Sequence, residues 1–309
     1  MFIGHATLAF GVVALLALHY GASRERALAL AVAAGLFAAV PDVDMAYAVV
    51  GLFAVDPTSP MAVAESFWGA STVVHRALTH SLVVAVPAAA AFALAPTHRR
   101  TAAAALVALV AVAGVVSGPL AALILGLFGA GGWLVARFSH ATGVQGRTLF
   151  GVALFGLASH PFGDLFTGEP PELFYPLDFA VFDGRVLLSG DPTVHLLGAF
   201  GVELAAVWLG VAAAVWLSGH RLSDHVSVRA TAGGAYALAA LVLPPPTLDA
   251  SYQFVFSVVA VGFVGAVPNP RLGDRSLALP SLPTAVVTGL AAVTLAGTAY
   301  GVAYATQLV

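Results

Sequence analysis

The stretch TAAAALVALVAVAGVVSGPLAALILGLFGAGGWLVA, residues 101–136, contains no charged side chain. A helix that crosses a lipid bilayer needs about 20 predominantly apolar residues, so this stretch is long enough for two such helices. Ser117, Gly118 and Pro119 lie near its middle. Because glycine weakens a helix and proline removes one of its hydrogen bonds, we predict a hairpin of two membrane helices and not one long helix.

The composition of the whole chain is that of a membrane protein. Of the 309 residues, 60% are hydrophobic and 9% are charged, and the mean hydropathy is +0.96. An ordinary soluble domain has about 25% charged residues. We therefore expect an all-α fold, a polytopic integral membrane bundle of about eight to ten transmembrane helices. The ten spans that we assign are residues 2–20, 25–41, 78–95, 101–117, 119–136, 147–163, 194–218, 229–244, 252–268 and 283–305.

Charge and cysteine content exclude several classes of function. The twelve basic residues are outnumbered by fifteen acidic ones, and a net charge of -3 leaves no basic surface for nucleic acid. The chain has no cysteine, so it can form neither a disulfide nor a thiolate metal site. A bound metal ion would have to be held by nitrogen and oxygen atoms.

The arginines predict the orientation in the membrane. Ten of the twelve lie in five short loops that the predicted spans place on one side, and the positive-inside rule makes that side cytoplasmic. The opposite, extracytoplasmic side then carries both termini and the loops 42–77 and 164–193. If residues 101–136 were a single span, Arg137 and Arg147 would move to the extracytoplasmic side, so the charge distribution also favours the hairpin.

Four short polar strings each lie at the end of a predicted span, and all four ends fall on the extracytoplasmic side. An ionisable group at membrane depth costs several kcal/mol unless it is paired or coordinated, so these residues are functional candidates. Imidazole and carboxylate groups without sulfur suit zinc, manganese or iron. Seven ligands are too many for one tetrahedral ion, so we predict two or three divalent ions, most readily zinc. The candidate ligands are His5, Asp42, Asp44, His75, His80, His160 and Asp164.

The spacing within the strings gives local expectations. His160 and Asp164 are four residues apart and share a helix face, although Pro161 predicts a kink or a helix end there. Asp42 and Asp44 can converge only if the backbone leaves helical geometry after Pro41. His75 and His80 are separated by roughly 140° on an ideal helix, so we expect His75 in the preceding loop or first turn and His80 at the start of the helix.

Arg76 departs from the charge bias, as Arg185 does, and it lies on the extracytoplasmic side between two candidate ligands. A guanidinium group beside a metal cluster suits a phosphate or another oxyanion. We therefore expect catalytic roles for Arg76, as the phosphate-binding group, and for Asp164. The alternative is that the string HRALTH is an interfacial anchor whose basic side chains reach the lipid headgroups.

The ordered set of strings resembles the YdjM-like family, described as inner-membrane, metal-dependent hydrolases. That family carries Gly-His, then P-D-[IV]-D, then H-R-G-x-T-H-S, then S-H-x-x-x-D. Here the strings are GH at 4–5, PDVD at 41–44, HRALTHS at 75–81 and SHPFGD at 159–164, with Ala77 in place of the usual glycine. The resemblance covers residues 1 to about 180. It implies a metal-site membrane domain over 1–180, followed by additional transmembrane helices of unknown role over 181–309.

The resemblance and the candidate ligands together suggest a hydrolase of the cell membrane that resembles a phosphoesterase or a phospholipase. Water activated by the metal ions would attack a phosphoester of a lipid or of another membrane-associated small molecule. The alternative is a non-catalytic metal-binding membrane protein with a structural, sensing or transport role. A transporter would place polar groups along a path through the bilayer midplane, where Glu203 is the clear candidate in this sequence.

Overall fold

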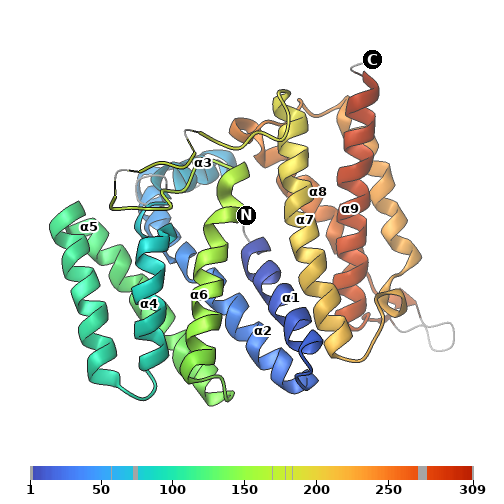
Figure 1. Ribbon diagram of the computed structural model, residues 1–309. Helices are drawn as coiled ribbons and strands as arrows, with labels where there is room; N and C mark the ends of the chain where they lie inside the picture. Colours follow the sequence, from blue (N-terminus) through green and yellow to red (C-terminus); the bar gives the residue numbers. More distant parts are fainter. Residues whose placement is uncertain are drawn as a thin grey trace. The chain divides into compact units, whose positions relative to one another are not determined.

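The computed structural model describes residues 3–56, 58–71, 76–168, 170–177, 179–182, 184–270 and 277–307. Its regular secondary structure is helical, apart from a two-residue antiparallel pair formed by β1 (Asn269–Pro270) and β2 (Leu277–Ala278). The predicted all-α fold is therefore confirmed. The chain divides into two compact units, Met1–Val186 and Leu187–Val309, which are described separately below (Figure 1).

Unit 1 is built around α2, which packs against both α1 and α6, while α4 packs against α5 and α6 (Figure 1). Its elements are α1 (Gly4–His19), α2 (Arg24–Ala39), η1 (Pro41–Ala54), α3 (Pro60–Ser71), η2 (Leu78–His80), α4 (Leu82–Leu94), α5 (Arg99–Ala141), α6 (Gly146–Gly163) and η3 (Asp164–Phe166).

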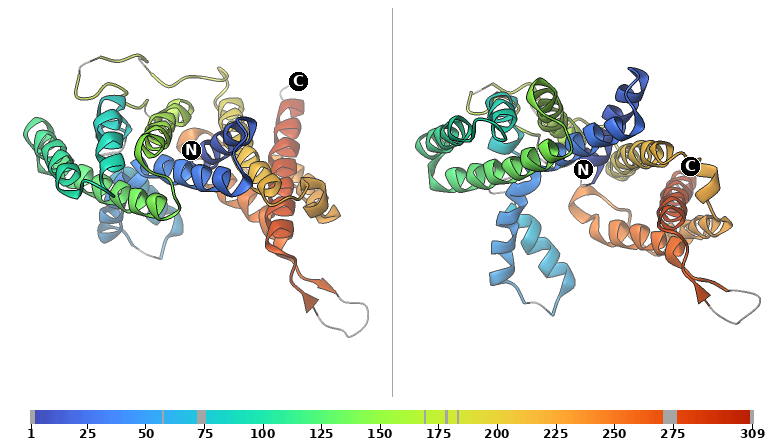
Figure 2. Two further views of the ribbon diagram at one scale, coloured as in Figure 1. Left: turned by 60° about the horizontal axis from the view of Figure 1, so that its bottom comes forward. Right: turned by 90° about the horizontal axis from the view of Figure 1, so that it is seen from below.

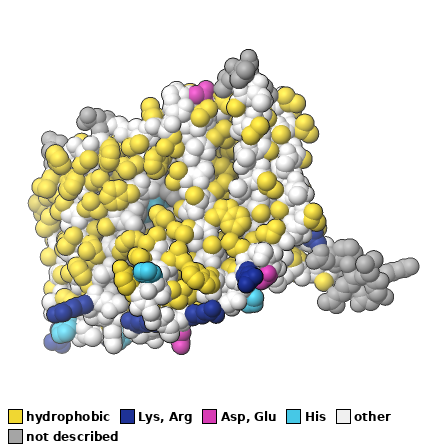
Figure 3. All heavy atoms as spheres, turned by 45° about the vertical axis from the view of Figure 1, so that its right-hand side comes forward, with side chains coloured by type: hydrophobic (Ala, Val, Ile, Leu, Met, Phe, Trp, Pro, Cys, Tyr) yellow, Lys and Arg dark blue, Asp and Glu magenta, His cyan; other side chains and the backbone are white. Residues whose placement is uncertain are grey.

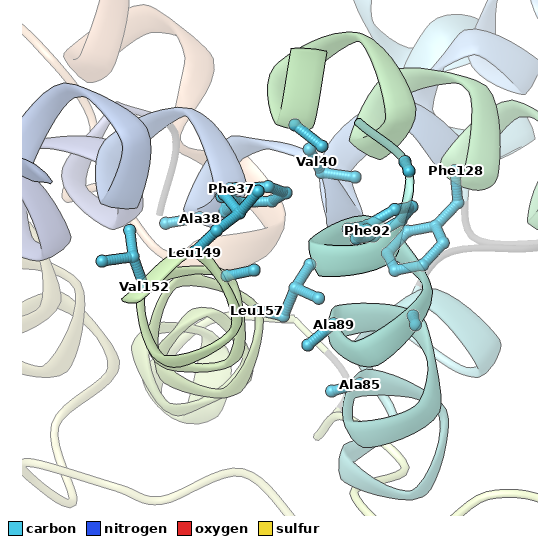
Figure 4. Packing of buried hydrophobic residues seen from close by; sticks show 14 of the residues in the cluster. Phe37, Ala38, Val40, Ala85, Ala89, Phe92, Phe128, Leu149, Val152 and Leu157 are labelled. Carbon is cyan, nitrogen blue, oxygen red and sulfur yellow. The ribbon is translucent and has the colours of Figure 1, made fainter. Parts of the chain in front are cut away.

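Small residues let the helices of unit 1 approach closely, as is common in membrane proteins. A Cβ atom on Gly35 would lie 2.9 Å from the Ala6 carbonyl oxygen of α1, and one on Gly156 would lie 2.7 Å from the Ala34 carbonyl oxygen of α2. Larger apolar side chains fill the space between α2, α4, α5 and α6, where Figure 4 shows Phe37, Phe92 and Phe128 together. These contacts hold the ends of α2 and α6 close together.

The break predicted in residues 101–136 is confirmed by the backbone of α5, while two separate membrane spans in this stretch stay a prediction. Gly118 has φ 86° and ψ 179°, which interrupts the helix directly before Pro119. Figure 1 shows the two arms of α5 bent against each other. Near the bend the arms are in contact, since a Cβ atom on Gly114 would lie 3.3 Å from the Ala122 Cβ atom.

Four helical segments in the described part of the chain are long and apolar enough to cross a membrane, namely α5, Gly146–Phe166, α7 (Pro192–Leu217) and α9 (Leu282–Gln307). A fifth would be α2 together with η1, two helices bent by 41° at their junction. Shorter apolar helices are Gly4–His19, Leu82–Leu94 and Tyr252–Ala266. The structure therefore supports four or five spans by length and composition, and the number of ten stays a prediction.

The predicted loop 42–77 is wrong over its described part, because η1 and α3 form a helical hairpin there. The two helices touch closely: the Ser66 hydroxyl donates a hydrogen bond to the Gly51 carbonyl oxygen at 2.7 Å. A Cβ atom on Gly51 would lie only 2.2 Å from the Ser66 carbonyl oxygen. Polar and proline residues lie at the ends and the tip of this hairpin and at Glu65 and Ser66 of α3, and most of the remaining residues are apolar.

Unit 2 is organised around α9, which packs against η5, η7 and α7. A side-chain hydrogen bond of 2.9 Å joins Trp208 of α7 to Thr294 of α9. Figure 3 shows one face of the molecule, on which hydrophobic side chains are abundant, as expected for a surface in contact with lipid. The elements of unit 2 are α7 (Pro192–Leu217), η4 (Leu222–His225), η5 (Val228–Leu241), η6 (Leu248–Ala250), α8 (Tyr252–Ala260), η7 (Val261–Ala266), β1, β2 and α9 (Leu282–Gln307).

Candidate metal site

Unit 1 brings six of the seven predicted ligands together from four separate segments. They lie at the start of α1, in the first turn of η1, at the end of η2, and where α6 passes into η3. Five of the six side chains are buried, and that of Asp42 is 30% exposed. His75, the seventh predicted ligand, lies outside the described residues. The six ligands are His5, Asp42, Asp44, His80, His160 and Asp164.

The centre of the site is formed by His80, His160 and Asp164. The Nε2 atoms of the two histidines are 3.0 Å apart. Asp164 Oδ2 lies 3.2 Å from His80 Nε2 and 3.7 Å from His160 Nε2. The three ligand atoms lie within 4.8 Å of one another and could hold one metal ion.

A second group of possible ligands shares His160 with the first and consists of His5, Asp42 and His160. Asp42 Oδ1 lies 3.4 Å from His160 Nε2, and the imidazole ring of His5 stacks on that of His160 at a centroid distance of 3.8 Å. His5 Nε2 is also 3.3 Å from Asp164 Oδ1. The two carboxylate oxygens of Asp164 therefore face different histidines.

Hydrogen bonds determine which nitrogen of His160 carries the proton. His160 Nδ1 lies 2.6 Å from the carbonyl oxygen of Ala38, which is the last residue but one of α2. Because a carbonyl oxygen can only accept, Nδ1 is the donor, and in the neutral ring Nε2 then presents its lone pair. Such a second contact is how proteins commonly orient a histidine that binds a metal ion.

The same reasoning applies to His80 through Thr79 and Asp44. The Thr79 hydroxyl donates to Asp44 Oδ2 at 2.7 Å, so its oxygen is free to accept from His80 Nδ1 at 2.9 Å. The Nε2 lone pair of neutral His80 therefore also points toward His160. Asp44 lies beside Nδ1 of His80, at 3.6 Å, and so on the opposite side of that ring from Asp164.

Thr79 is a site residue that the sequence reasoning missed, since it is not itself a candidate metal ligand. Its position directly before His80 was the available signal. The start of the helix was also misplaced: α4 begins at Leu82, and both Thr79 and His80 lie in η2 before it. Ser81 is the reason, because its hydroxyl oxygen accepts from the backbone N–H groups of Val83 and Val84 and so caps α4.

His80 is enclosed by the loop that follows η3. The Ser81 hydroxyl donates to the Tyr175 carbonyl oxygen at 2.6 Å, and the Leu82 backbone N–H donates to the Leu173 carbonyl oxygen at 2.8 Å. His80 lies outside the long apolar helices, and its burial lowers the pKa of its imidazole to about 4. The ring is therefore neutral at pH 7, which is the form that binds a metal ion.

The two pairs of ligands that are close in sequence, His160 with Asp164 and Asp42 with Asp44, lie in different backbone geometries. The helix α6 continues through Pro161 and ends at Gly163, and Asp164 keeps a helical backbone (φ -86°, ψ -7°), so His160 and Asp164 share a face as expected. Asp42 and Asp44 lie in the 3₁₀ geometry of η1, where the backbone has left the α-helix. As a result Asp42 faces His160, whereas Asp44 faces Thr79 and His80.

Arg76 contacts the turn that carries Asp164. Its Nη2 atom is 3.4 Å from Asp164 Oδ1 and 3.2 Å from the Thr167 hydroxyl. Its Nη1 atom donates to the Asp164 carbonyl oxygen at 3.3 Å and also to the Thr167 carbonyl oxygen. Arg76 itself has a positive φ of 73°, and its carbonyl oxygen accepts a hydrogen bond from the backbone N–H of Glu172. The guanidinium group thus holds η3 in place and lies beside the site.

Comparison with known proteins identifies the family of the chain. No curated protein and no solved structure matches it. The family described as "YdjM inner membrane protein" matches residues 1–244, which include every predicted ligand and extend past residue 180 through α7 and η5. The match and the apolar helices support a location in the cell membrane. By this match over most of its length, the chain belongs to the YdjM inner membrane protein family.

Proposed function

We propose that this protein is a membrane-embedded, metal-dependent hydrolase that acts on a phosphoester of a lipid or of another membrane-associated molecule. The observation that carries the proposal is the distance of 3.0 Å between the Nε2 atoms of His80 and His160 beside the Asp164 carboxylate, with a hydrogen-bond partner at Nδ1 of each ring. Three lone-pair donors directed at one point repel one another unless a cation lies between them. A divalent metal ion fits that position.

The donor set fits zinc, with manganese or iron as further possibilities, because it combines neutral imidazole with carboxylate and has no sulfur. His80, His160 and Asp164 would hold one ion. His5 and Asp42 would contribute to a second, with Asp164 between the two through its separate oxygens. When bound, such ions supply Lewis acidity and lower the pKa of a water molecule that can attack phosphorus.

The substrate would reach the site from the side of Asp42, since Asp42 is the partly exposed ligand. Arg76 would contribute positive charge next to Asp164 and bind the phosphate. In the present arrangement its Nη atoms bond to Thr167 and Asp164, so a phosphate would have to replace the contacts with Thr167. Asp164 would act together with the metal ions, in contact with Arg76.

We also propose that the site faces the extracytoplasmic side in a chain of about ten spans. Supporting evidence comes from α2 and α6 in unit 1. Arg24 begins α2 and Arg147 lies in the first turn of α6, whereas Asp42 follows the end of α2 and His160 lies in the last turn of α6. The arginines and the candidate ligands thus lie at opposite ends of these helices.

A non-catalytic metal-binding role is the alternative. A transporter binds its ion near the middle of the membrane, between interrupted helices. The candidate ligands instead lie at the ends of α2 and α6 and at the start of α1. This position favours an enzyme whose substrate lies at the membrane surface.

Metal analysis of the purified protein tests the site. We expect at least one equivalent of metal in the wild type and its loss in the variants His160→Ala, Asp164→Ala and His75→Ala. His98→Ala, at an exposed histidine before α5, is the matched control and should keep the metal. Less than one equivalent in the wild type, or no loss in the variants, would show that the site is wrong.

A second measurement separates the enzyme from a metal-binding protein. Phosphate release or headgroup release from a panel of phospholipids is measured with and without a chelator. Release that depends on metal and disappears in Asp164→Ala supports the hydrolase. A protein that holds metal and releases nothing from any membrane phosphoester supports the non-catalytic alternative.

A further inference from the structure

The hairpin of η1 and α3 stands apart from the rest of unit 1. In the right-hand view of Figure 2 the two helices extend from the end of α2 to one side of α4, α5 and α6. The helix α3 packs chiefly against η1, and between Met45 and Ala70 the only described side chain that is buried is that of Ala48. Most of the surface of this hairpin is therefore available to the surroundings.

The described side chains of η1 that are fully exposed are all apolar. Val49, Val50, Leu52 and Phe53 are all exposed, and Phe53 is the most exposed of them at 86%. A 3₁₀ helix has three residues per turn, so Val50 and Phe53 form one row and Val49 and Leu52 form the adjacent row. A continuous apolar surface of this kind marks a contact with a protein or a membrane.

The surface of α3 and the tip of the hairpin differ from these apolar rows, because each carries one exposed carboxylate. Glu65 is exposed on α3, and Asp56 is exposed at the tip. Asp56 Oδ1 accepts hydrogen bonds from the backbone N–H and the hydroxyl of Thr58, and these bonds lower the pKa of Asp56. This carboxylate is therefore ionised at neutral pH and requires water or polar headgroups around it.

The course of the chain shows which surface the apolar rows meet. The helix α2 belongs to the packed bundle of an inner membrane protein, and η1 leaves its end at an angle of 41°. With residues 25–41 as a membrane span of their own, as we predict from the sequence, the hairpin starts where that span ends, at the level of the headgroups. On α3, the rings of Phe67 and Trp68 meet edge to face at 5.4 Å, and tryptophan is enriched at this level of a bilayer.

We propose that the hairpin of η1 and α3 lies in the membrane–water interface, with Val49, Val50, Leu52 and Phe53 against lipid acyl chains and with Asp56 and Glu65 toward water. Asp42 lies in the first turn of η1, so the hairpin begins at the partly exposed ligand of the metal site. On the proposed function, this surface would present the lipid substrate to the site. The contact with lipid itself does not depend on hydrolysis.

The absence of cysteine allows a direct test with single labels. Phe53→Cys and Glu65→Cys are each labelled with the fluorophore NBD and reconstituted in vesicles of phosphatidylcholine and phosphatidylglycerol. We expect a blue-shifted emission at position 53 that is lost when the lipids carry a doxyl group on the acyl chain. At position 65 we expect emission that is quenched by aqueous iodide and little by the acyl-chain doxyl group.

Two results would overturn the proposal. Quenching by iodide at position 53 as strong as at position 65 would place η1 in water. Resistance of position 53 to both quenchers, together with a disulfide between two copies of unlabelled Phe53→Cys, would identify a second copy of the chain as the partner. Val50→Cys lies in the same row as Phe53 and carries the same expectation, so the test does not rest on one variant. Neither metal nor substrate is needed, and a failure of the proposed hydrolysis leaves the result unchanged.

Discussion

His80 and His160 show how single residues prepare the site. Each imidazole is buried, and each has a partner at Nδ1, the Thr79 hydroxyl for His80 and the Ala38 carbonyl oxygen for His160. These partners direct both Nε2 lone pairs to one point before any ion is bound. Ligands that are already oriented need less ordering when the ion arrives, which increases affinity.

Thr79→Val tests this orientation. The substitution keeps the shape of the side chain and removes the hydroxyl that joins His80 to Asp44. We expect the affinity for zinc to fall by about 10- to 100-fold, the usual effect of losing such a partner. Competition with a chromophoric chelator measures the affinity.

The chain offers a matched control for this variant. Thr97 lies 2.9 Å from His98 Nδ1 in the same way, but the pair is exposed and distant in sequence from every candidate ligand. Thr97→Val should leave the affinity unchanged. Equal affinities for the two variants would contradict the role of Thr79.

At the scale of elements, close helix contacts and a helix cap place the site residues. Gly35 and Gly156 let α1 and α6 approach the backbone of α2, and this brings His160 within reach of the Ala38 carbonyl oxygen. Ser81 ends η2 and begins α4, which leaves His80 outside the helix. The hairpin of η1 and α3 likewise depends on one small residue, Gly51, at its closest contact.

Gly51→Val tests whether this hairpin is helical and packed. The new Cβ atom would lie 2.2 Å from the Ser66 carbonyl oxygen, so the two helices would have to separate. Overpacking of this kind costs about 1–3 kcal/mol. We expect faster hydrogen exchange of the backbone amides in residues 45–71, measured by mass spectrometry.

Gly69→Val is the control within the same hairpin, because a Cβ atom on Gly69 meets nothing within 4 Å. This variant should exchange like the wild type. If both variants, or neither, exchange faster, the close contact between η1 and α3 is not present in the membrane.

At the scale of the whole molecule, the distribution of arginine predicts the orientation of the chain. The loop between α5 and α6 is flanked by arginines, whereas the tip of the η1 and α3 hairpin carries Asp56. Single cysteines at these two places report the sides of the membrane, because the natural chain has none.

We expect Thr58→Cys to react with a membrane-impermeant maleimide in intact cells and Thr142→Cys to react only after permeabilisation. Both side chains are exposed, so the comparison reports the side of the membrane and not burial. The reversed pattern would place the metal site on the cytoplasmic side. Reaction of both positions in intact cells would show that the two loops lie on the same side.

Much of the fold could be predicted from local sequence. The apolar composition requires helices, because a backbone in lipid must satisfy its own hydrogen bonds. The break at Gly118 and Pro119 follows from the conformations of these two residues, and the structure confirms it. The resemblance carried by the four polar strings is confirmed by the family match. The helical hairpin after Asp44 could not be predicted in this way, because contacts with α3 decide its conformation.

The sequence by itself determined a helical membrane protein of a known family and named the residues that meet at its site. Only the tertiary structure decided how they meet: that Asp42 faces His160, that Asp44 lies behind His80, and that Thr79 takes part. These relations join residues that lie 35 to 118 positions apart in the chain. Distances of this kind depend on how closely the helices pack, and no local pattern of residues contains that information.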